Sequence, residues 1–315
     1  MLKYRSYLVT GGAGFIGSHL VEKLIQLGCQ VRVLDDFSTG KEENLAHLTG
    51  QVEVVRGDIR NLDLCYQAVR GIEVILHQAA LASVPASISD PVLAHEINLT
   101  GTLNLLLAAA KTSIKSFVLA SSSAVYGDDQ TFPKIEGQEG KPLSPYASQK
   151  LSSEKYCQVF SWLYGFNTVC LRYFNVFGPR QDPSSQYAAV IPNFITRMLQ
   201  GLPPEIYGDG CQSRDFIYVE NVVQANLKAA SFDHFRGQAF NIGASKRITI
   251  NELANSINSC LGAAIQPVYA APRAGDIRES WADISRAEKY LGFKPEINFE
   301  QGLKLTVDWY CSRLK

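Results

Sequence analysis

Short runs of β-branched and aliphatic residues alternate with longer amphipathic stretches through the first half of the chain. The runs that we expect to be strands are 7–9, 31–34, 52–55, 74–76, 117–120 and 168–171, and the expected helices are 15–27, 99–111 and 145–162. Strands alternating with helices of about 10 to 15 residues are typical of right-handed βαβ units in a parallel sheet. The pattern therefore predicts an α/β fold of the Rossmann type, with a doubly wound parallel sheet.

The pattern changes after residue 174, where Gly-Pro, Pro-Pro and Gly-Asp-Gly sequences separate shorter elements. We expect residues 1–174 to form the sheet domain and residues 175–315 to form a smaller, mixed α/β lobe. The chain is expected to cross between the two near residues 214–242. The cleft between them is the expected ligand site.

Composition and charge exclude several classes of function. Hydrophobic residues make up 46% of the 315, which is enough for a large core, and 30 basic residues balance 30 acidic ones. With a formal net charge of zero, the chain as a whole has no electrostatic attraction to nucleic acid or to an anionic membrane. No apolar run approaches the length of about 18 residues that spans a bilayer. We therefore expect a cytoplasmic protein with no nucleic-acid or membrane partner.

The cysteines and histidines give no sign of a metal site. Seven cysteines and five histidines are scattered along the chain, without the C-x-x-C or H-x-x-x-H spacing that holds zinc. Scattered thiols of this kind suit a reducing compartment. The sequence therefore predicts no metal.

A glycine-rich segment follows the first expected strand and opens the first expected helix. Gly11 suits a tight turn, Gly14 allows the backbone to approach a pyrophosphate, and Gly17 allows close packing of the helix. The spacing is G-x-x-G-x-x-G, which is typical of short-chain dehydrogenases. The dinucleotide site is expected to include Gly11, Gly14, Phe15, Ile16 and Gly17.

Carboxylates follow the next two strands. Asp35 and Asp36 end the second strand, where a carboxylate accepts hydrogen bonds from the adenosine ribose and repels a 2′-phosphate, so NAD is favoured over NADP. Asp58 and Ile59 follow the third strand, at the expected adenine edge. Asp58 could instead cap the helix that begins near Leu62, because aspartate is a favoured N-cap.

Tyr146 and Lys150 form a Y-x-x-x-K pair, and this spacing places both side chains on one helix face. A neighbouring cation and a positive nicotinamide ring would lower the pKa of the phenol, so that Tyr146 could act as a base near neutral pH. Such pairs are also common on solvated helices. The strand at 117–120 supports a catalytic role for the pair, because the serine hydroxyls at 121–123 follow it directly and lie at the carboxyl edge of the sheet.

Together these segments resemble the extended short-chain dehydrogenases/reductases along essentially the whole chain. In that family a serine or threonine acts with the tyrosine and the lysine. The family's hydroxyl residue lies four positions before the V-Y-G tyrosine, which here selects Ser122, with Ser123 as a second candidate. The resemblance implies NAD as cofactor. The residues that it adds to the expected NAD contacts are Ala79, Ala80, Asn98, Tyr146, Lys150 and Tyr173.

Four later segments, at 172–179, 207–210, 214–216 and 273–276, resemble those with which nucleotide-sugar epimerases hold their substrates. The resemblance implies that Asn175 bonds the diphosphate or the sugar and that Tyr207 lines the uridine pocket. It also implies that Arg214 and Arg273 clamp the diphosphate, a role that suits the planar, permanently charged guanidinium. The substrate contacts implied in full are Ser83, Ser122, Tyr146, Asn175, Ala189, Tyr207, Arg214, Arg273 and Ser280.

Two serines indicate which sugar the substrate carries. The segments at 77–80 and 82–85 resemble the subgroup that acts on UDP-N-acetylhexosamines, in which Ser83 would touch the substrate. Ser280 stands where the family carries either a bulky or a small residue, and a small one leaves room for a 2-acetamido group. The resemblance thus implies an NAD-dependent 4-epimerase that interconverts UDP-N-acetylglucosamine and UDP-N-acetylgalactosamine, and also UDP-glucose and UDP-galactose, through a 4-keto intermediate.

Other readings of the same residues stay open. A UDP-glucuronate 4-epimerase or a nucleotide-sugar 4,6-dehydratase would use the same scaffold. Dehydratases and decarboxylases of the family typically carry an acidic residue soon after the hydroxyl, where this chain has Ser123 and Ala124, and this favours epimerases. An NAD-sensing regulatory protein is the non-enzyme alternative, against which the intact serine, tyrosine and lysine argue. We expect a homodimer that pairs through the helices at 99–111 and 145–162.

Overall fold

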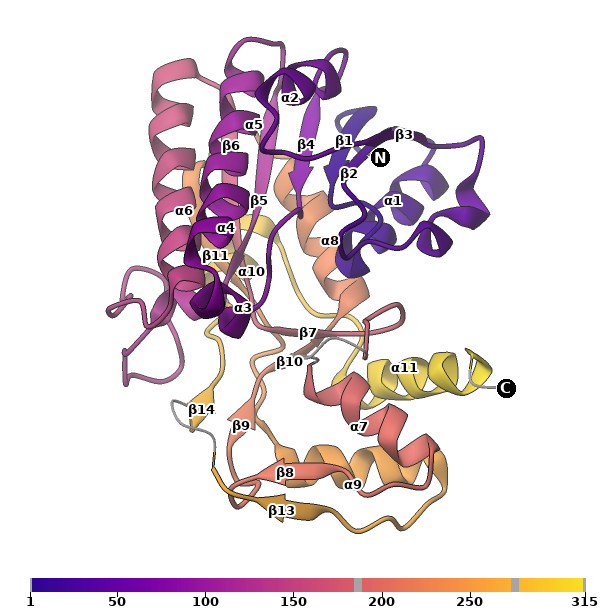
Figure 1. Cartoon of the computed structure of the whole chain (residues 1–315). Coiled ribbons are helices and arrows are strands. Elements are labelled where there is room, and N and C mark those ends of the chain that lie inside the picture. Colours follow the sequence, from indigo (N-terminus) through magenta and orange to yellow (C-terminus); the bar gives the residue numbers. More distant parts are fainter. Residues whose placement is uncertain (1, 184–188, 273–277, 314–315) are drawn as a thin grey trace.

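The computed structural model describes residues 2–183, 189–272 and 278–313. Its centre is a sheet of seven parallel strands in the order β11-β6-β5-β4-β1-β2-β3 (Figure 1). The strands are β1 (Ser6–Thr10), β2 (Gln30–Asp35), β3 (Glu53–Arg56), β4 (Val74–His77), β5 (Ser116–Ser122), β6 (Asn167–Tyr173) and β11 (Arg236–Ile242). The predicted α/β, doubly wound fold is confirmed. The strand order reverses between β1 and β4, where open α/β sheets bind ligands beyond their carboxyl ends.

Helices cover both faces of this sheet. The main ones are α1 (Phe15–Gln26) and α8 (Val219–Ala230) on one face, and α2 (Leu62–Ala68), α5 (Gly101–Ala110) and α6 (Pro145–Tyr164) on the other. Successive side chains of a strand point to opposite faces. Accordingly, Tyr7 and Val9 of β1 pack with the residues of α1 and α8, whereas Leu8 packs with those of α5 and α6.

The long helix α6 has clear signals at both ends. The Ser144 side chain accepts a hydrogen bond from the Ala147 N–H, Pro145 occupies the first turn, and Gly165 ends the helix in the left-handed conformation. The helix expected at 99–111 starts differently. A π-helical turn (η3, Glu96–Thr100) precedes α5, and two short helices, α3 (Val84–Ser89) and α4 (Pro91–His95), lead into it.

The remaining elements form a smaller lobe beneath the sheet (Figure 1). Its strands are β7 (Asn175–Phe177) with β10 (Phe216–Tyr218), β8 (Glu205–Tyr207) with β13 (Val268–Ala270), and β9 (Ser213–Arg214) between β12 (Ile248–Thr249) and β14 (Glu279–Ser280). Its helices are α7 (Val190–Leu199), α9 (Ile250–Leu261) and α11 (Phe299–Arg313), which share a separate apolar cluster. The short helices η1 (Glu42–Asn44), η2 (Ala46–Leu48), η4 (Ser123–Tyr126) and α10 (Ser285–Leu291) complete the chain.

The chain enters this lobe at β7 and then returns. Helix α8 covers the sheet and β11 extends it beside β6, while α10 packs against β11. A domain boundary at residue 174 stays a prediction. Within the described ranges, no helix combines the length and the apolar character needed to cross a bilayer.

Candidate active site

The glycine turn between β1 and α1 is packed too tightly for side chains. A Cβ on Gly17 would lie 2.0 Å from the Gly11 carbonyl oxygen, and one on Gly11, whose φ is +65°, would lie 2.7 Å from the Ala79 nitrogen. Gly14 is the N-cap of α1, with no side chain capping the helix and no acidic residue in its first turn, which holds Phe15 and Ile16. The helix N-terminus is thus available to an anion, as a dinucleotide pyrophosphate requires.

The two aspartates after β2 differ in their surroundings. The Asp35 carboxylate is buried and accepts hydrogen bonds from the N–H groups of Ala13 and Phe37, both at 2.8 Å. Burial raises the pKa of Asp35, and the two N–H donors act in the opposite direction. Asp36 is exposed and accepts hydrogen bonds from the N–H and the hydroxyl of Ser38. Asp35 therefore lies against the glycine turn, as a contact to the adenosine ribose would need.

The structure excludes one of the two interpretations of Asp58 and leaves the adenine contact a prediction. Helix α2 is capped by Asn61, whose side chain accepts a hydrogen bond from the Leu64 N–H, so the interpretation of Asp58 as the N-cap is wrong. Asp58 instead accepts hydrogen bonds from the Arg60 N–H and guanidinium, both at 2.8 Å. Burial raises the pKa of Asp58, but the bonds from Arg60 outweigh it and the net shift is downward. Ile59 is buried in the sheet core.

A buried polar chain, which sequence reasoning missed, supports the segment that carries Ala79 and Ala80. Thr10 Oγ1 lies 2.7 Å from His77 Nδ1 and accepts a hydrogen bond from the Ala79 N–H. The other ring nitrogen of His77 lies 2.9 Å from Thr102 Oγ1. Burial lowers the pKa of His77 to about 3, so the ring is neutral and acts as a structural link.

Asn98 lies in the π-helical turn and ties three segments together. Its side-chain amide accepts a hydrogen bond from the Leu81 N–H and donates one to the Leu81 carbonyl, and it lies 2.9 Å from the Gln149 amide. The hydroxyls of Thr102 and Ser153 donate hydrogen bonds to the Asn98 carbonyl, which the π-helical turn leaves available. Asn98 thus anchors the loop after β4 to α6.

Ser122, Tyr146 and Lys150 meet at the carboxyl edge of the sheet. Ser122 ends β5, and Tyr146 and Lys150 occupy the first turns of α6 on its buried side. Lys150 is 3% exposed; its Nζ donates a hydrogen bond to the Ala120 carbonyl at 2.8 Å and lies 5.9 Å from the centre of the Tyr146 ring. The Ser122 hydroxyl lies close enough to the Tyr146 phenol to lower the pKa of that phenol. The geometry thus brings Ser122 to the tyrosine, while Ser123 begins the short helix η4.

Burial dominates the electrostatics of this group in the protein alone. Burial raises the pKa of Tyr146, and the nearby Ser122 hydroxyl only partly offsets it, so Lys150 does not bring the phenol to a low pKa in the protein alone. The pKa of Lys150 is itself lowered to about 8, because burial disfavours its charge. Both groups lie where burial disfavours a charge, so the expected lowering of the Tyr146 pKa, which includes the effect of a bound nicotinamide ring, stays a prediction. A further positive charge, such as that of a bound nicotinamide ring, is needed.

Tyr173, at the end of β6, is also buried at this edge. Its hydroxyl accepts a hydrogen bond from Asn226 at 2.7 Å and lies 3.3 Å from the Gln78 amide oxygen. Burial raises its pKa above the usual range of a tyrosine, so the phenol stays protonated. Tyr173 therefore packs between α8 and the loop that carries Ala79, and its expected contact with NAD stays a prediction.

The residues expected to hold the substrate come from the smaller lobe and from α3. Arg214 on β9 pairs in register with Ser280 on β14. Tyr207 ends β8, and its hydroxyl donates a hydrogen bond to Glu205 at 3.0 Å. Asn175 begins β7, where its N–H donates to the Asp215 carbonyl.

Two further members of that set lie at helix starts. Ser83 caps α3 by accepting a hydrogen bond from the Ala86 N–H, and Ala189 is the exposed N-cap of α7. Arg273 lies outside the described residues. The role of each side chain toward a substrate stays a prediction.

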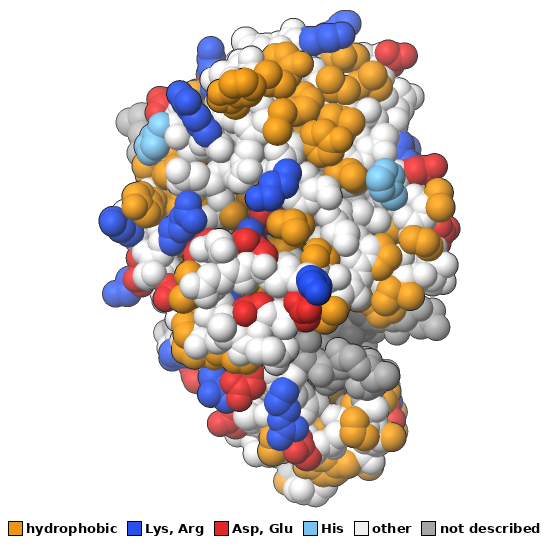
Figure 2. Space-filling view, turned by 90° about the vertical axis from the view of Figure 1, so that its left-hand side faces the viewer, with side chains coloured by type: hydrophobic (Ala, Val, Ile, Leu, Met, Phe, Trp, Pro, Cys, Tyr) orange, Lys and Arg blue, Asp and Glu red, His pale blue; other side chains and the backbone are white. Residues whose placement is uncertain are grey.

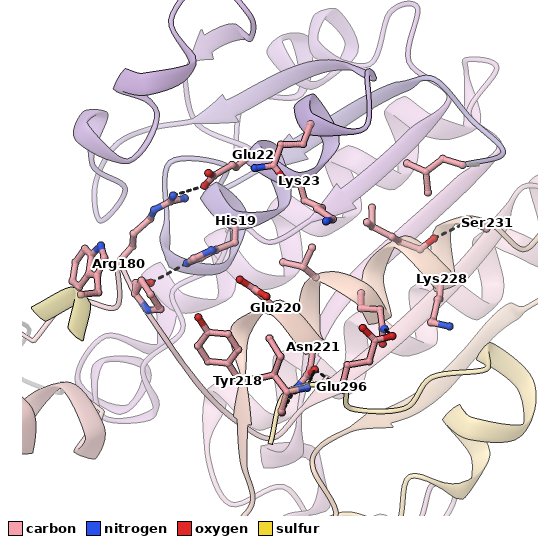
Figure 3. Close-up of a pocket in the computed structure, with 18 residues that line it drawn as sticks. His19, Glu22, Lys23, Arg180, Tyr218, Glu220, Asn221, Lys228, Ser231 and Glu296 are labelled. Carbon is pink, nitrogen blue, oxygen red and sulfur yellow. Dashed lines mark hydrogen bonds and ion pairs between the residues drawn. The ribbon is translucent and has the colours of Figure 1, made fainter. Parts of the chain in front are cut away.

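A separate cavity of about 560 Å³ lies between α1, α8 and the segment at 296–297 (Figure 3). His19 and Glu22 line it from α1 and Arg180 lines it from the loop after β7. Of the described residues expected at the NAD or substrate sites, none lines it. Burial lowers the pKa of His19 to about 4, and its ring bonds the Pro179 carbonyl. Among the described residues, no cluster of histidine, cysteine and acidic side chains could hold a metal ion.

Comparisons with known proteins agree with this geometry. Residues 7–243 match the NAD dependent epimerase/dehydratase family. The chain is 38% identical to the UDP-glucose 4-epimerase of Mycolicibacterium smegmatis over 310 residues, 97% of this chain and 98% of that protein.

Solved structures match over the same length. The UDP-N-acetylglucosamine 4-epimerase of Methanobrevibacter ruminantium M1, in complex with UDP-N-acetylmuramic acid, has a TM-score of 0.95 at 43% identity and covers 99% of this chain and 100% of its own. The UDP-glucose 4-epimerase of Thermus thermophilus, in complex with NAD, has a TM-score of 0.88 at 38% identity, with 97% and 98% covered. The chain therefore belongs to the NAD-dependent epimerase/dehydratase family, uses NAD as its cofactor, and groups within the family with the UDP-sugar 4-epimerases.

Proposed function

We propose that this protein is a UDP-N-acetylglucosamine 4-epimerase, which forms UDP-N-acetylgalactosamine and also accepts UDP-glucose and UDP-galactose. The observation that carries the proposal is the group formed at the carboxyl edge of the sheet by the buried Tyr146 and Lys150 and the partly buried Ser122, with no carboxylate directly after the serine. A hydroxyl, a phenol and an ammonium in this arrangement suit removal and return of a proton at a sugar hydroxyl.

In the mechanism, Tyr146 removes the proton from the 4-hydroxyl and later returns it. Ser122, which lies near the Tyr146 hydroxyl, stabilises the charge on the sugar oxygen and relays the proton. Lys150, one helical turn after Tyr146, is assigned to bond the nicotinamide ribose. NAD, when bound, supplies the reversible hydride acceptor for C4, so no second redox substrate is needed.

The smaller lobe would hold the nucleotide while the sugar changes face. Arg214 and Arg273 are assigned to the diphosphate, because a guanidinium offers paired donors to phosphate oxygens. With the diphosphate fixed, the 4-keto sugar can rotate about its link to the diphosphate. The opposite face of the sugar then points toward the cofactor, and hydride returns to C4 from that face. Tyr207 and Asn175 are assigned to the uridine and the diphosphate on the same lobe.

The preference for an acetylated sugar rests on Ser280. This side chain is half-buried on β14, beside Arg214 in the adjacent strand. A serine leaves space for a 2-acetamido group at this position, whereas a tyrosine would overlap with it. A 4,6-dehydratase is disfavoured, because Ser123 and Ala124 supply no carboxyl group for the elimination of water.

The decisive experiment incubates the NAD-loaded protein, without added reductant, with UDP-N-acetylglucosamine and separately with UDP-glucose, and resolves the C4 epimers by chromatography. We expect both to be converted, the acetylated sugar faster. The matched variant Ser280→Tyr should lose the acetylated substrate and keep UDP-glucose. Conversion of neither sugar by the wild type would refute the proposal; an unchanged preference in the variant would refute the role of Ser280.

We also propose that the protein is a homodimer that pairs through α5 and α6. Hydrophobic side chains gather on the face that carries α6 (Figure 2). Val159, Trp162 and Leu163 on this helix are exposed, Trp162 to 74%, and a patch of exposed large apolar side chains marks an interaction site. Light scattering should give the mass of two chains, and Trp162→Asp should give that of one; a monomeric wild type would refute the pairing.

A further inference from the structure

Asp215 is a fully buried carboxylate directly after Arg214, and the mechanism above gives it no part. Its Oδ1 accepts a hydrogen bond from the Ala244 N–H at 2.7 Å, and its Oδ2 accepts bonds from the N–H groups of Ser245 and Ala282, at 3.0 and 3.1 Å. One carboxylate thus joins three pieces of the smaller lobe: β9, the loop after β11, and the segment after β14.

The loop that Asp215 holds is strained. Ser245 has a φ of +56°, a conformation that residues other than glycine avoid and that persists only where surrounding contacts fix it. Both the backbone and the side chain of Ser245 make such contacts. Its N–H donates a hydrogen bond to Asp215, and its hydroxyl donates one to the Ala282 carbonyl at 2.8 Å. Space is equally restricted, because a Cβ on Gly243 would lie 2.7 Å from Asp215 Oδ2.

The joined segments carry the side chains assigned to the substrate. Ala282 lies two residues after Ser280, and Ser280 is the register partner of Arg214. On the other side, the Asp215 carbonyl accepts the N–H of Asn175 at 3.0 Å. Burial raises the pKa of the Asp215 carboxyl to about 6, and the N–H donors around it act in the opposite direction.

We propose that Asp215 is a positioning residue that fixes the distance between Arg214 and Ser280, and thereby sets both diphosphate affinity and the discrimination between acetylated and plain hexoses. This inference rests on the proposed function for the identity of the substrate. Asp215 itself touches no substrate. It acts through the backbone of β9 and of the segment at 280–282, which carry the residues that do.

The test compares wild type, Asp215→Asn and Asp283→Asn, all loaded with NAD, by calorimetric titration with UDP. Asparagine keeps the volume of Asp215 but sets an NH₂ group against backbone donors. We expect UDP to bind about tenfold more weakly or worse, since hydrogen bonds to a charged acceptor are stronger than neutral ones. NAD content should be unchanged. The Asp283 side chain accepts a hydrogen bond from the Ser285 N–H, near the same segment, so its variant should bind UDP normally.

Two further measurements separate positioning from general damage. The ratio of kcat/KM for the acetylated sugar over the plain one should shift in Asp215→Asn, because a misplaced Ser280 affects only the larger substrate; a merely unfolded fraction would lower both rates equally. If Asp215→Asn does not fold, Ser245→Ala takes its place, since it keeps the N–H donor but loses the hydroxyl bond to Ala282. It should weaken UDP binding by about threefold, the effect of one neutral hydrogen bond.

The failures of the two proposals are distinguishable. Wild-type protein that binds UDP but epimerises neither sugar would refute the proposed function alone. A folded Asp215→Asn variant that binds UDP as tightly as wild type, with an unchanged ratio between the two sugars, would overturn the inference alone. Wild-type protein that binds no UDP would overturn both.

Discussion

Glu154 and Arg172 form a buried ion pair that holds α6 to the sheet behind the catalytic group. Glu154 follows Lys150 by one helical turn, and its carboxylate binds the Arg172 guanidinium through two contacts, at 2.9 and 2.7 Å. The Ser121 hydroxyl donates a third bond to Glu154, at 2.5 Å. Both charged side chains are almost fully buried. The register of α6, and so the direction in which its tyrosine and lysine point, depends on this pair.

Replacing Glu154 by glutamine leaves the Arg172 charge buried without its main partner. Removing one member of a buried pair costs about 3 to 5 kcal/mol of the free energy of unfolding. Arg172 keeps contacts with Glu139 and with the Tyr126 hydroxyl, so we expect a loss near the lower end, about 3 kcal/mol. Urea denaturation followed by circular dichroism measures this loss directly.

Two comparisons make the measurement decisive. The double variant Glu154→Leu/Arg172→Met should recover part of the stability, because a buried pair replaced by apolar groups is often neutral, while Glu139 loses its ion pair with Arg172. Asp233→Asn removes an exposed pair with Lys3 and should leave the unfolding midpoint unchanged. A loss below about 1 kcal/mol in Glu154→Gln would refute the reasoning, since that is the range of exposed pairs.

Further outcomes can be checked at the active site. Tyr146→Phe lacks the phenol oxygen, so kcat should fall by about 10² to 10⁴ while NAD content and UDP affinity persist; an initial-rate assay that shows a smaller loss would remove Tyr146 as the base. Because the pKa of Lys150 is lowered from 10.5 to about 8, its charge is lost as pH rises through 8. The value of kcat/KM should therefore decline above about pH 8, and a flat profile to about pH 9.5 would contradict this. The same shift stabilises the folded protein relative to the unfolded chain as pH rises from about 8 to 10.5, because the unfolded lysine stays protonated to higher pH. Gly17→Ala places a Cβ 2.0 Å from the Gly11 carbonyl and should abolish NAD retention, measured by absorbance of the released cofactor; full retention would exclude the tight turn.

The sheet and its helices could be predicted from the sequence because each is encoded locally. Buried parallel strands are continuous apolar runs, and the helix at 145–162 has its cap, its proline and its final glycine within or beside the segment itself. The π-helical turn at 96–100 could not be predicted. It depends on hydrogen bonds to the Asn98 carbonyl from Thr102, one turn later, and from Ser153, which lies in a different helix.

The buried polar networks could not be predicted from the sequence for a related reason. Asp215 and Ala282 are 67 residues apart, and Glu154 and Arg172 are 18 apart on a helix and a strand. Only the tertiary fold brings such partners together, and no periodicity marks them. The electrostatics of Tyr146 in the protein alone could not be predicted for a different reason: burial raises the pKa of the phenol, and a sequence does not display how deeply a side chain is buried.

The position of β11 has a consequence for how the protein is made. This strand covers β6, all of whose residues are buried, and it leaves the ribosome only after the lobe has begun with β7 to β10. Until residue 242 has been synthesised, the nascent chain carries an unpaired, apolar sheet edge, which is a template for association with other chains. The sheet therefore cannot close early during translation, and a chain truncated near residue 174 should aggregate rather than fold as an independent cofactor-binding unit.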